Sequence, residues 1–147
     1  MTTLNRTAAE IVTSSLGFAV HGMTDVTGFG MIGHAREMAV ASGVSLRIHA
    51  SRVSLLAGAM ECVRAGYVPG GLKSNRSFAE SCVEFEDGVP EEIRTLLFDP
   101  QTAGGLLVSV AEKDAERLVA ALRNSAIDAV EIGEVIPKQK PLIRVAA

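Results

Sequence analysis

Aromatic residues are scarce in this sequence, at 4% of its 147 residues, with one tyrosine and no tryptophan. A hydrophobic core therefore has to be built from aliphatic residues. These are plentiful, because hydrophobic residues make up 48% of the chain. A chain of 147 residues can bury roughly 68–70% of the surface that it exposes when unfolded. We therefore expect one folded domain over residues 1–147.

Three further absences exclude classes of function. The chain has two cysteines, Cys62 and Cys82, and no C-x-x-C pair, which argues against a disulfide framework or a cysteine-based zinc site. It has no apolar run of the ~20 residues that span a membrane, and its first residues lack the features of a secretory signal. Its net charge of -3 comes without a basic stripe. We expect a cytoplasmic protein with buried thiols and with no membrane or nucleic-acid partner.

The spacing of apolar residues predicts an α+β fold in which helices pack against a mixed β-sheet. Helices are expected at about 3–15, 30–42, 54–65, 90–98 and 112–122, and strands at about 18–24, 44–48, 82–86, 106–110, 129–136 and 142–145. Gly43 is expected to end the second helix. The segment 67–77 contains Pro69-Gly70-Gly71 and is expected to be a loop.

The segment TDVTGFGMIG, residues 24–33, has glycines in the G-x-G-x-x-G spacing of dinucleotide-binding folds. An NADP-binding Rossmann module is therefore one alternative. Two features weigh against it: polar residues stand where an apolar strand should precede the first glycine, and no carboxylate lies near positions 48–53.

The same segment suits phosphate and metal chemistry. Gly28 and Gly30 can adopt positive φ angles and let a ligand approach the backbone. The N–H groups at the start of the following helix can face an anion, and Asp25 can bind Mg²⁺. The structural alternative is a tight strand-to-helix turn in which Asp25 or Thr27 only caps the helix. Spacing alone does not separate these two interpretations.

Several motifs occur in order along the chain. They are Met1-Thr2-Thr3-Leu4-Asn5 with Ala8-Ala9; His21-x-x-Thr24-Asp25-Val26-Thr27-Gly28-Phe29-Gly30 with Gly33-His34-Ala35-Arg36-Glu37-Met38; Val68-Pro69-Gly70-Gly71 with Asn75; Leu97-Phe98-Asp99-Pro100-Gln101-Thr102-Ala103-Gly104-Gly105-Leu106; and Ile132-Gly133-Glu134-Val135. Together they resemble the C-terminal domain of selenophosphate synthetase (selenide, water dikinase). This domain has the fold of the aminoimidazole ribonucleotide synthetase-like superfamily.

The resemblance implies an enzyme that converts selenide, ATP and water into selenophosphate, AMP and phosphate, with Mg²⁺ as cofactor. It implies that Asp25 is a Mg²⁺ ligand, completing an aspartate cluster supplied mainly by an N-terminal domain. It also implies that the full enzyme is a homodimer. The residues that it places against the phosphates, or on the second wall of the same cleft, are Thr24, Thr27, Gly28, Gly30, Asp99, Thr102, Gly104 and Gly105.

By the same resemblance, the catalytic nucleophile and most Mg·ATP ligands belong to an N-terminal domain that has no counterpart in this sequence. We therefore expect no catalytic residue here and no activity from this chain alone. Cys62 and Cys82 are expected to be core residues. His34 either faces the cleft or serves in packing or capping. A functional alternative of another class is a stand-alone binding or assembly module that has kept the fold without the chemistry.

Overall fold

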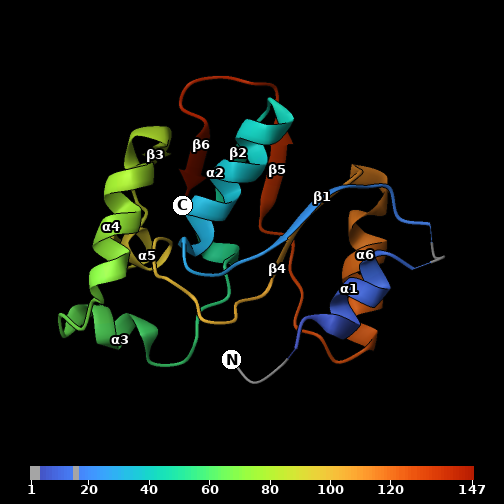
Figure 1. Ribbon diagram of the computed structural model, residues 1–147, viewed down its shortest axis with the longest axis horizontal. Coiled ribbons are helices and arrows are strands. Elements are labelled where there is room, and N and C mark those ends of the chain that lie inside the picture. Colours follow the sequence, from blue (N-terminus) through green and yellow to red (C-terminus); the bar gives the residue numbers. More distant parts are fainter. Residues whose placement is uncertain (1–3, 15–16) are drawn as a thin grey trace.

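The computed structural model describes residues 4–14 and 17–147 (Figure 1). Its helices are α1 (Arg6–Val12), α2 (Gly30–Ser42), α3 (Ala59–Arg64), α4 (Gly70–Ala79), α5 (Glu91–Leu96) and α6 (Glu112–Asn124), with short 3₁₀ helices η1 (Ala50–Arg52) and η2 (Glu80–Cys82). Its strands are β1 (Val20–Asp25), β2 (Ser45–His49), β3 (Val83–Phe85), β4 (Leu106–Val110), β5 (Gly133–Ile136) and β6 (Ile143–Ala146). None of the helices in these ranges is both long and apolar enough to cross a membrane.

The strands form two sheets. β1 and β4 make an antiparallel ribbon, and the other four strands make a mixed sheet in the order β3-β6-β2-β5. In the mixed sheet β2 runs antiparallel to β5 and parallel to β6, and β3 runs parallel to β6. The α+β prediction is confirmed. The Rossmann alternative is wrong, because β1 and β2 lie in different sheets, whereas a Rossmann fold pairs its first two strands in parallel.

The larger core lies between the four-stranded sheet and helices α2, α4 and α5. Its fully buried residues include Ile32 on α2, Leu72 on α4, Phe98 after α5, and Ile143 and Val145 on β6. Each large apolar side chain buried in this way stabilises the fold by about 1.5–3 kcal/mol relative to exposure. This core fixes the start of α2 relative to the chain that follows α5.

A smaller core joins α1, α6 and the β1–β4 ribbon. Its buried residues are Val12, Leu118 and Leu122. Figure 1 shows α1 beside α6 at one end of the molecule, with the ribbon running from this pair toward α2. Buried Asp114, in the first turn of α6, accepts hydrogen bonds from the Ala19 N–H at 3.1 Å and from the Arg117 guanidinium at 2.7 Å. The start of β1 is thereby tied to α6.

Two sequence predictions for the middle of the chain are wrong. The segment 67–77 is not a loop, because α4 begins at Gly70 immediately after Pro69, whose extended backbone (φ -67°, ψ 150°) leads into the helix. The predicted helix at 54–65 is shorter, since only Ala59–Arg64 is helical and Leu56 is exposed. Glycine and proline therefore marked the start of a helix here, as proline often does.

The expected burial of the thiols is also wrong. Cys62 is exposed on α3, and Cys82 is half-buried at the end of η2. The helix predicted at 3–15 is α1, Arg6–Val12; positions 3 and 15 lie outside the described residues. By contrast, the helix at 30–42 is confirmed. It ends at Gly43 in the left-handed conformation (φ 66°), as predicted.

Candidate functional site

The glycine loop, defined here as residues 26–30, connects β1 to α2. The Thr27 N–H donates to Nε2 of His34 at 3.0 Å, and the Thr27 hydroxyl lies 3.1 Å from the same nitrogen. An acceptor nitrogen carries no proton, so the neutral ring holds its proton on Nδ1. His34 is half-buried and bonds to the loop that precedes its own helix, but it is not a side-chain cap of α2. Neither Asp25 nor Thr27 caps α2 with its side chain, since Phe29 occupies the N-cap position without a side-chain hydrogen bond.

The glycines of the loop differ in what they do. Gly30 has φ +68°, and a Cβ there would lie 2.7 Å from the carbonyl carbon of Phe98. A Cβ at Gly33 would lie 2.7 Å from Cβ of Phe29. Gly28, however, does not have a positive φ, and a Cβ there would meet nothing within 4 Å. Gly30 and Gly33 are therefore needed for close packing, whereas Gly28 leaves open space on the outer side of the loop.

A second loop, residues 99–105, is bonded directly to the glycine loop. The Gln101 N–H donates to the Thr27 carbonyl and the Gly104 N–H to the Val26 carbonyl, both at 3.0 Å. In return, the Val26 N–H donates to the Gly105 carbonyl at 2.9 Å. A Cβ at Gly104 would collide with the Val26 carbonyl oxygen. The structure thus brings together the two segments that the sequence analysis assigned to opposite walls of one cleft.

Two asparagines outside these loops hold them in place. Nδ2 of Asn75, on α4, donates to the carbonyls of Gly28 at 2.9 Å and Phe98 at 3.0 Å. Nδ2 of Asn5, immediately before α1, donates to the Gly104 carbonyl at 2.9 Å. Sequence reasoning noted both asparagines within motifs but gave neither a role. A polar residue on the apolar face of an amphipathic segment was the available signal for Asn75.

Some of the backbone donors expected at the start of α2 are used within the protein. The Gly30 N–H donates to the Thr27 carbonyl and the Ile32 N–H to the Leu97 carbonyl, each at 3.0 Å. These two groups are therefore not available to a ligand. No hydrogen bond joins the N–H of Gly28 or Phe29 to any residue in the described part of the chain, and both residues are exposed. Gly28 and Phe29 therefore have backbone donors that are free to meet an anion.

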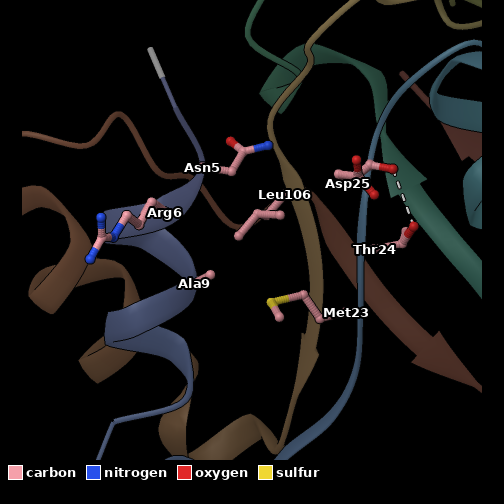
Figure 2. Close-up of a pocket in the computed structure, with 7 residues that line it drawn as sticks. All are labelled: Asn5, Arg6, Ala9, Met23, Thr24, Asp25 and Leu106. Carbon is pink, nitrogen blue, oxygen red and sulfur yellow. Dashed lines mark hydrogen bonds between the residues drawn. The ribbon is translucent and has the colours of Figure 1, made fainter.

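Asp25 ends β1 beside a surface groove of about 380 Å³. The groove is lined by Asn5, Arg6, Ala9, Met23, Thr24, Asp25 and Leu106. Figure 2 shows these side chains coming from the α1 region and from the two strands of the ribbon. The Asp25 side chain is exposed, while the Thr24 hydroxyl donates to the backbone carbonyl of Asp25 at 3.1 Å.

No group of three or more His, Cys, Asp or Glu side chains that could hold a metal occurs among residues 4–14 and 17–147. Asp25 can therefore supply one ligand but not a complete site. Mg²⁺ commonly takes only one or two protein carboxylates and completes its shell with water and phosphate oxygens. The exposed carboxylate of Asp25 fits this mode of binding.

The second loop contains Asp99, whose surroundings disfavour the charged form of its carboxyl group. Partial burial raises the pKa of Asp99, and the hydrogen bond from Gln101 Nε2 to Asp99 Oδ2 (2.9 Å) opposes this rise. Shifted carboxyl groups of this kind occur preferentially at functional sites. Thr102 and Gly105, which were also predicted to face the cleft, are exposed in the same loop.

This fold and its paired loops belong to a known class of domain. The chain matches the model of the family described as AIR synthase related protein, C-terminal domain, over residues 1–145. The chain therefore belongs to this family. The structure of HypE from E. coli, a hydrogenase maturation protein, resembles this one with a TM-score of 0.58 at 20% identity over 96% of this chain and 35% of that chain. That likeness supports the fold alone.

Within the family, the chain resembles selenide, water dikinases. It is 47% identical over 146 residues to the selenide, water dikinase of Pelobacter propionicus, covering 99% of this chain and 40% of the relative. It is 43% identical over 135 residues to that of Myxococcus xanthus, covering 92% of this chain and 38% of the relative. The chain thus spans about 40% of the length of these relatives and corresponds to their C-terminal part.

Proposed function

We propose that this chain is the C-terminal part of an enzyme that phosphorylates selenide with ATP and water, yielding selenophosphate, AMP and phosphate. In that enzyme it contributes one wall of the active site, which faces the metal and the phosphates. The proposal rests on one observation. The loops 26–30 and 99–105 are joined by backbone hydrogen bonds, and exposed Asp25 lies at the end of the adjoining strand β1. The similarity to selenide, water dikinases over nearly the whole chain supports the choice of reaction.

In this proposal the Asp25 carboxylate would supply one ligand of a Mg²⁺ ion. The bound ion would neutralise part of the negative charge of the phosphate oxygens. The exposed N–H groups of Gly28 and Phe29 donate to phosphate oxygens. The N–H and the hydroxyl of Thr27 both contact Nε2 of His34, so the role of Thr27 is to maintain the shape of the loop. Gly104 has a comparable role in the second loop, because only a residue without Cβ fits against Val26.

The remaining predicted residues contribute polar groups to the same wall. Asp99 presents a half-buried carboxyl group, and exposed Thr102 and Gly105 present a hydroxyl and backbone atoms. Thr24 supports Asp25 through its hydrogen bond to the backbone. Phosphoryl transfer depends on positioning and on charge stabilisation by groups from both sides. We therefore propose that the chain is inactive without the N-terminal part that its longer relatives contain.

The test is AMP formation from Mg·ATP in the presence of selenide. It should be measured with this chain alone, with the separately expressed N-terminal part of the Pelobacter propionicus relative, and with both together. Activity only in the mixture supports the proposal. Substantial turnover by this chain alone contradicts the claim that its site is incomplete, and an inactive mixture counts against the proposed reaction.

A non-catalytic binding or assembly module is the second candidate, and one observation favours it. Large apolar side chains are exposed around α3, where Leu56 is 65% exposed and Tyr67 is 76% exposed. Exposed apolar patches often mark surfaces that associate with proteins. Sedimentation velocity distinguishes this candidate: concentration-dependent self-association that is lost in Leu56→Ser supports it, and a monomer at all concentrations counts against it.

A further inference from the structure

Asn75 connects three parts of the molecule through one side-chain amide. It is only 9% exposed on α4, and its two donated hydrogen bonds end on the carbonyls of Gly28 and Phe98. The first carbonyl belongs to the glycine loop, and the second immediately precedes the 99–105 loop. An amide NH₂ has two donor hydrogens, whereas a serine hydroxyl has one and an ionised aspartate has none. Asparagine is therefore a small side chain that can hold both carbonyls at once.

The bond to Gly28 also determines where the next amide points. The peptide between Gly28 and Phe29 is trans, since the cis bond found among the described residues is Lys140-Pro141. In a planar trans peptide the carbonyl and the N–H point in opposite directions. Because Asn75 holds the Gly28 carbonyl toward α4, the Phe29 N–H points in the opposite direction, away from Asn75. That N–H has no acceptor within the described part of the chain.

We infer that Asn75 is a positioning residue, which fixes the glycine loop against the second loop and aims the Phe29 N–H at the ligand. The inference rests on the proposed function, in which that ligand is a phosphate group. Asn75 does not touch the ligand; it acts through the Gly28–Phe29 peptide. Without it, the peptide can rotate and the two loops keep only the backbone bonds between them.

Amide hydrogen exchange on the full chain tests the positional role directly. The reporters are the N–H groups of Gly30 and Gln101, which both donate to the Thr27 carbonyl. The reference is the N–H of His49, the last residue of β2, which donates at 2.7 Å to the carbonyl of Ile132, the residue just before β5. In Asn75→Ala we expect exchange at Gly30 and Gln101 to accelerate about tenfold or more relative to His49, because local opening no longer requires global unfolding. Equal acceleration at all three amides would overturn the inference.

Ser45→Ala provides a matched control. Ser45 is fully buried, and its hydroxyl both accepts from the Gln139 N–H at 2.9 Å and donates to the Gln139 carbonyl at 3.1 Å. It therefore also holds a distant loop with two hydrogen bonds, but not a loop of the site. This variant should leave the ratio of exchange at Gly30 to that at His49 unchanged. If Asn75→Ala does not fold, Asn75→Ser, which keeps one donor, takes its place and should show a smaller acceleration.

A second arm measures catalysis in the mixture with the N-terminal part of the relative. Displacement of reacting groups by about 1 Å can cost on the order of 100-fold in rate, so Asn75→Ala should lower kcat by about tenfold or more with a smaller change in KM for ATP. Ser45→Ala should retain kcat. An unchanged kcat in Asn75→Ala overturns the inference. If the unmodified mixture is inactive, the proposed function fails, while hydrogen exchange still decides whether Asn75 holds the loop.

Discussion

The two cores of this molecule support the candidate site unequally. Among residues 4–14 and 17–147, the larger core has eleven buried apolar residues and supports both loops through Phe98 and helices α2 and α4, whereas the smaller core has three. The smaller core nevertheless positions the ribbon that ends in Asp25, and Asn5 at the start of α1. The two loops proposed to face the phosphates therefore rest on the more rigid core, and the proposed metal ligand rests on the core that should open more easily.

The sharpest test of this contrast compares one truncation in each core. Phe98→Ala removes a fully buried side chain from the larger core and should reduce the free energy of unfolding by about 3–5 kcal/mol. Leu122→Ala in the smaller core, where the side chain is 8% exposed, should cost about 2–3 kcal/mol. Urea denaturation measures both. An equal or larger cost for Leu122→Ala would contradict the assigned ranking of the cores.

The next largest effect is expected where the larger core meets the glycine loop. Gly30→Ala should reduce the free energy of unfolding by about 2–4 kcal/mol. The new Cβ would collide with the Phe98 backbone, and alanine rarely adopts the positive φ found at this position. Gly28→Ala is the matched control, and its cost should be within about 0.5 kcal/mol because its Cβ would enter open space. Similar costs at both positions would show that the loop is packed differently.

A smaller effect should distinguish the second loop by its dependence on pH. Burial raises the pKa of Asp99, so the folded protein binds this proton more tightly than the unfolded chain. The resulting stabilisation is complete below the unfolded pKa of about 3.9 and is lost as pH rises through the raised folded value. Asp99→Asn should therefore be more stable than the unmodified protein at pH 7, by less than about 1 kcal/mol for a partly solvated group.

Thermal denaturation at pH 7 and at pH 3 checks this prediction. The advantage of Asp99→Asn should disappear at the lower pH, where the aspartate is protonated in both states. Asp128→Asn, at an exposed position outside the site, controls for the change in net charge. A loss of stability in Asp99→Asn at pH 7 would contradict the prediction, because it would mean that the hydrogen bond from Gln101 outweighs the cost of burying the carboxylate.

The sequence predicted the elements whose signals are local. Helix α2 and its end at Gly43 follow from apolar periodicity and from a glycine that can adopt a left-handed conformation. β4 and α6 also appear where periodicity placed them. The segregation of strands into two sheets could not be predicted, because pairing between distant strands such as β1 and β4 depends on tertiary contacts.

The candidate site was predicted only in part, because it also depends on tertiary contacts between distant segments. Motifs identified both loops and Asp25, but the contacts that join the loops are between backbone atoms and leave little trace in side-chain patterns. Asn75 was placed in an expected loop because Pro69-Gly70-Gly71 suggested a turn. Leu72, Asn75 and Ala79 are spaced as residues on one face of a helix, and all three are buried on α4. The neighbouring glycines favoured a loop instead, so this helical pattern was not used.

We propose that Asp25 is needed for the reaction as a Mg²⁺ ligand, although the fold does not depend on it. This claim is tested most directly by the rate of AMP formation in the mixture with Asp25→Asn, alongside the free energy of unfolding of the same variant. We predict a fall in rate of about 100-fold or more with a change in unfolding free energy within about 0.5 kcal/mol, because the side chain is exposed. The exposed control Asp128→Asn should retain its rate. Full activity in Asp25→Asn would contradict the account.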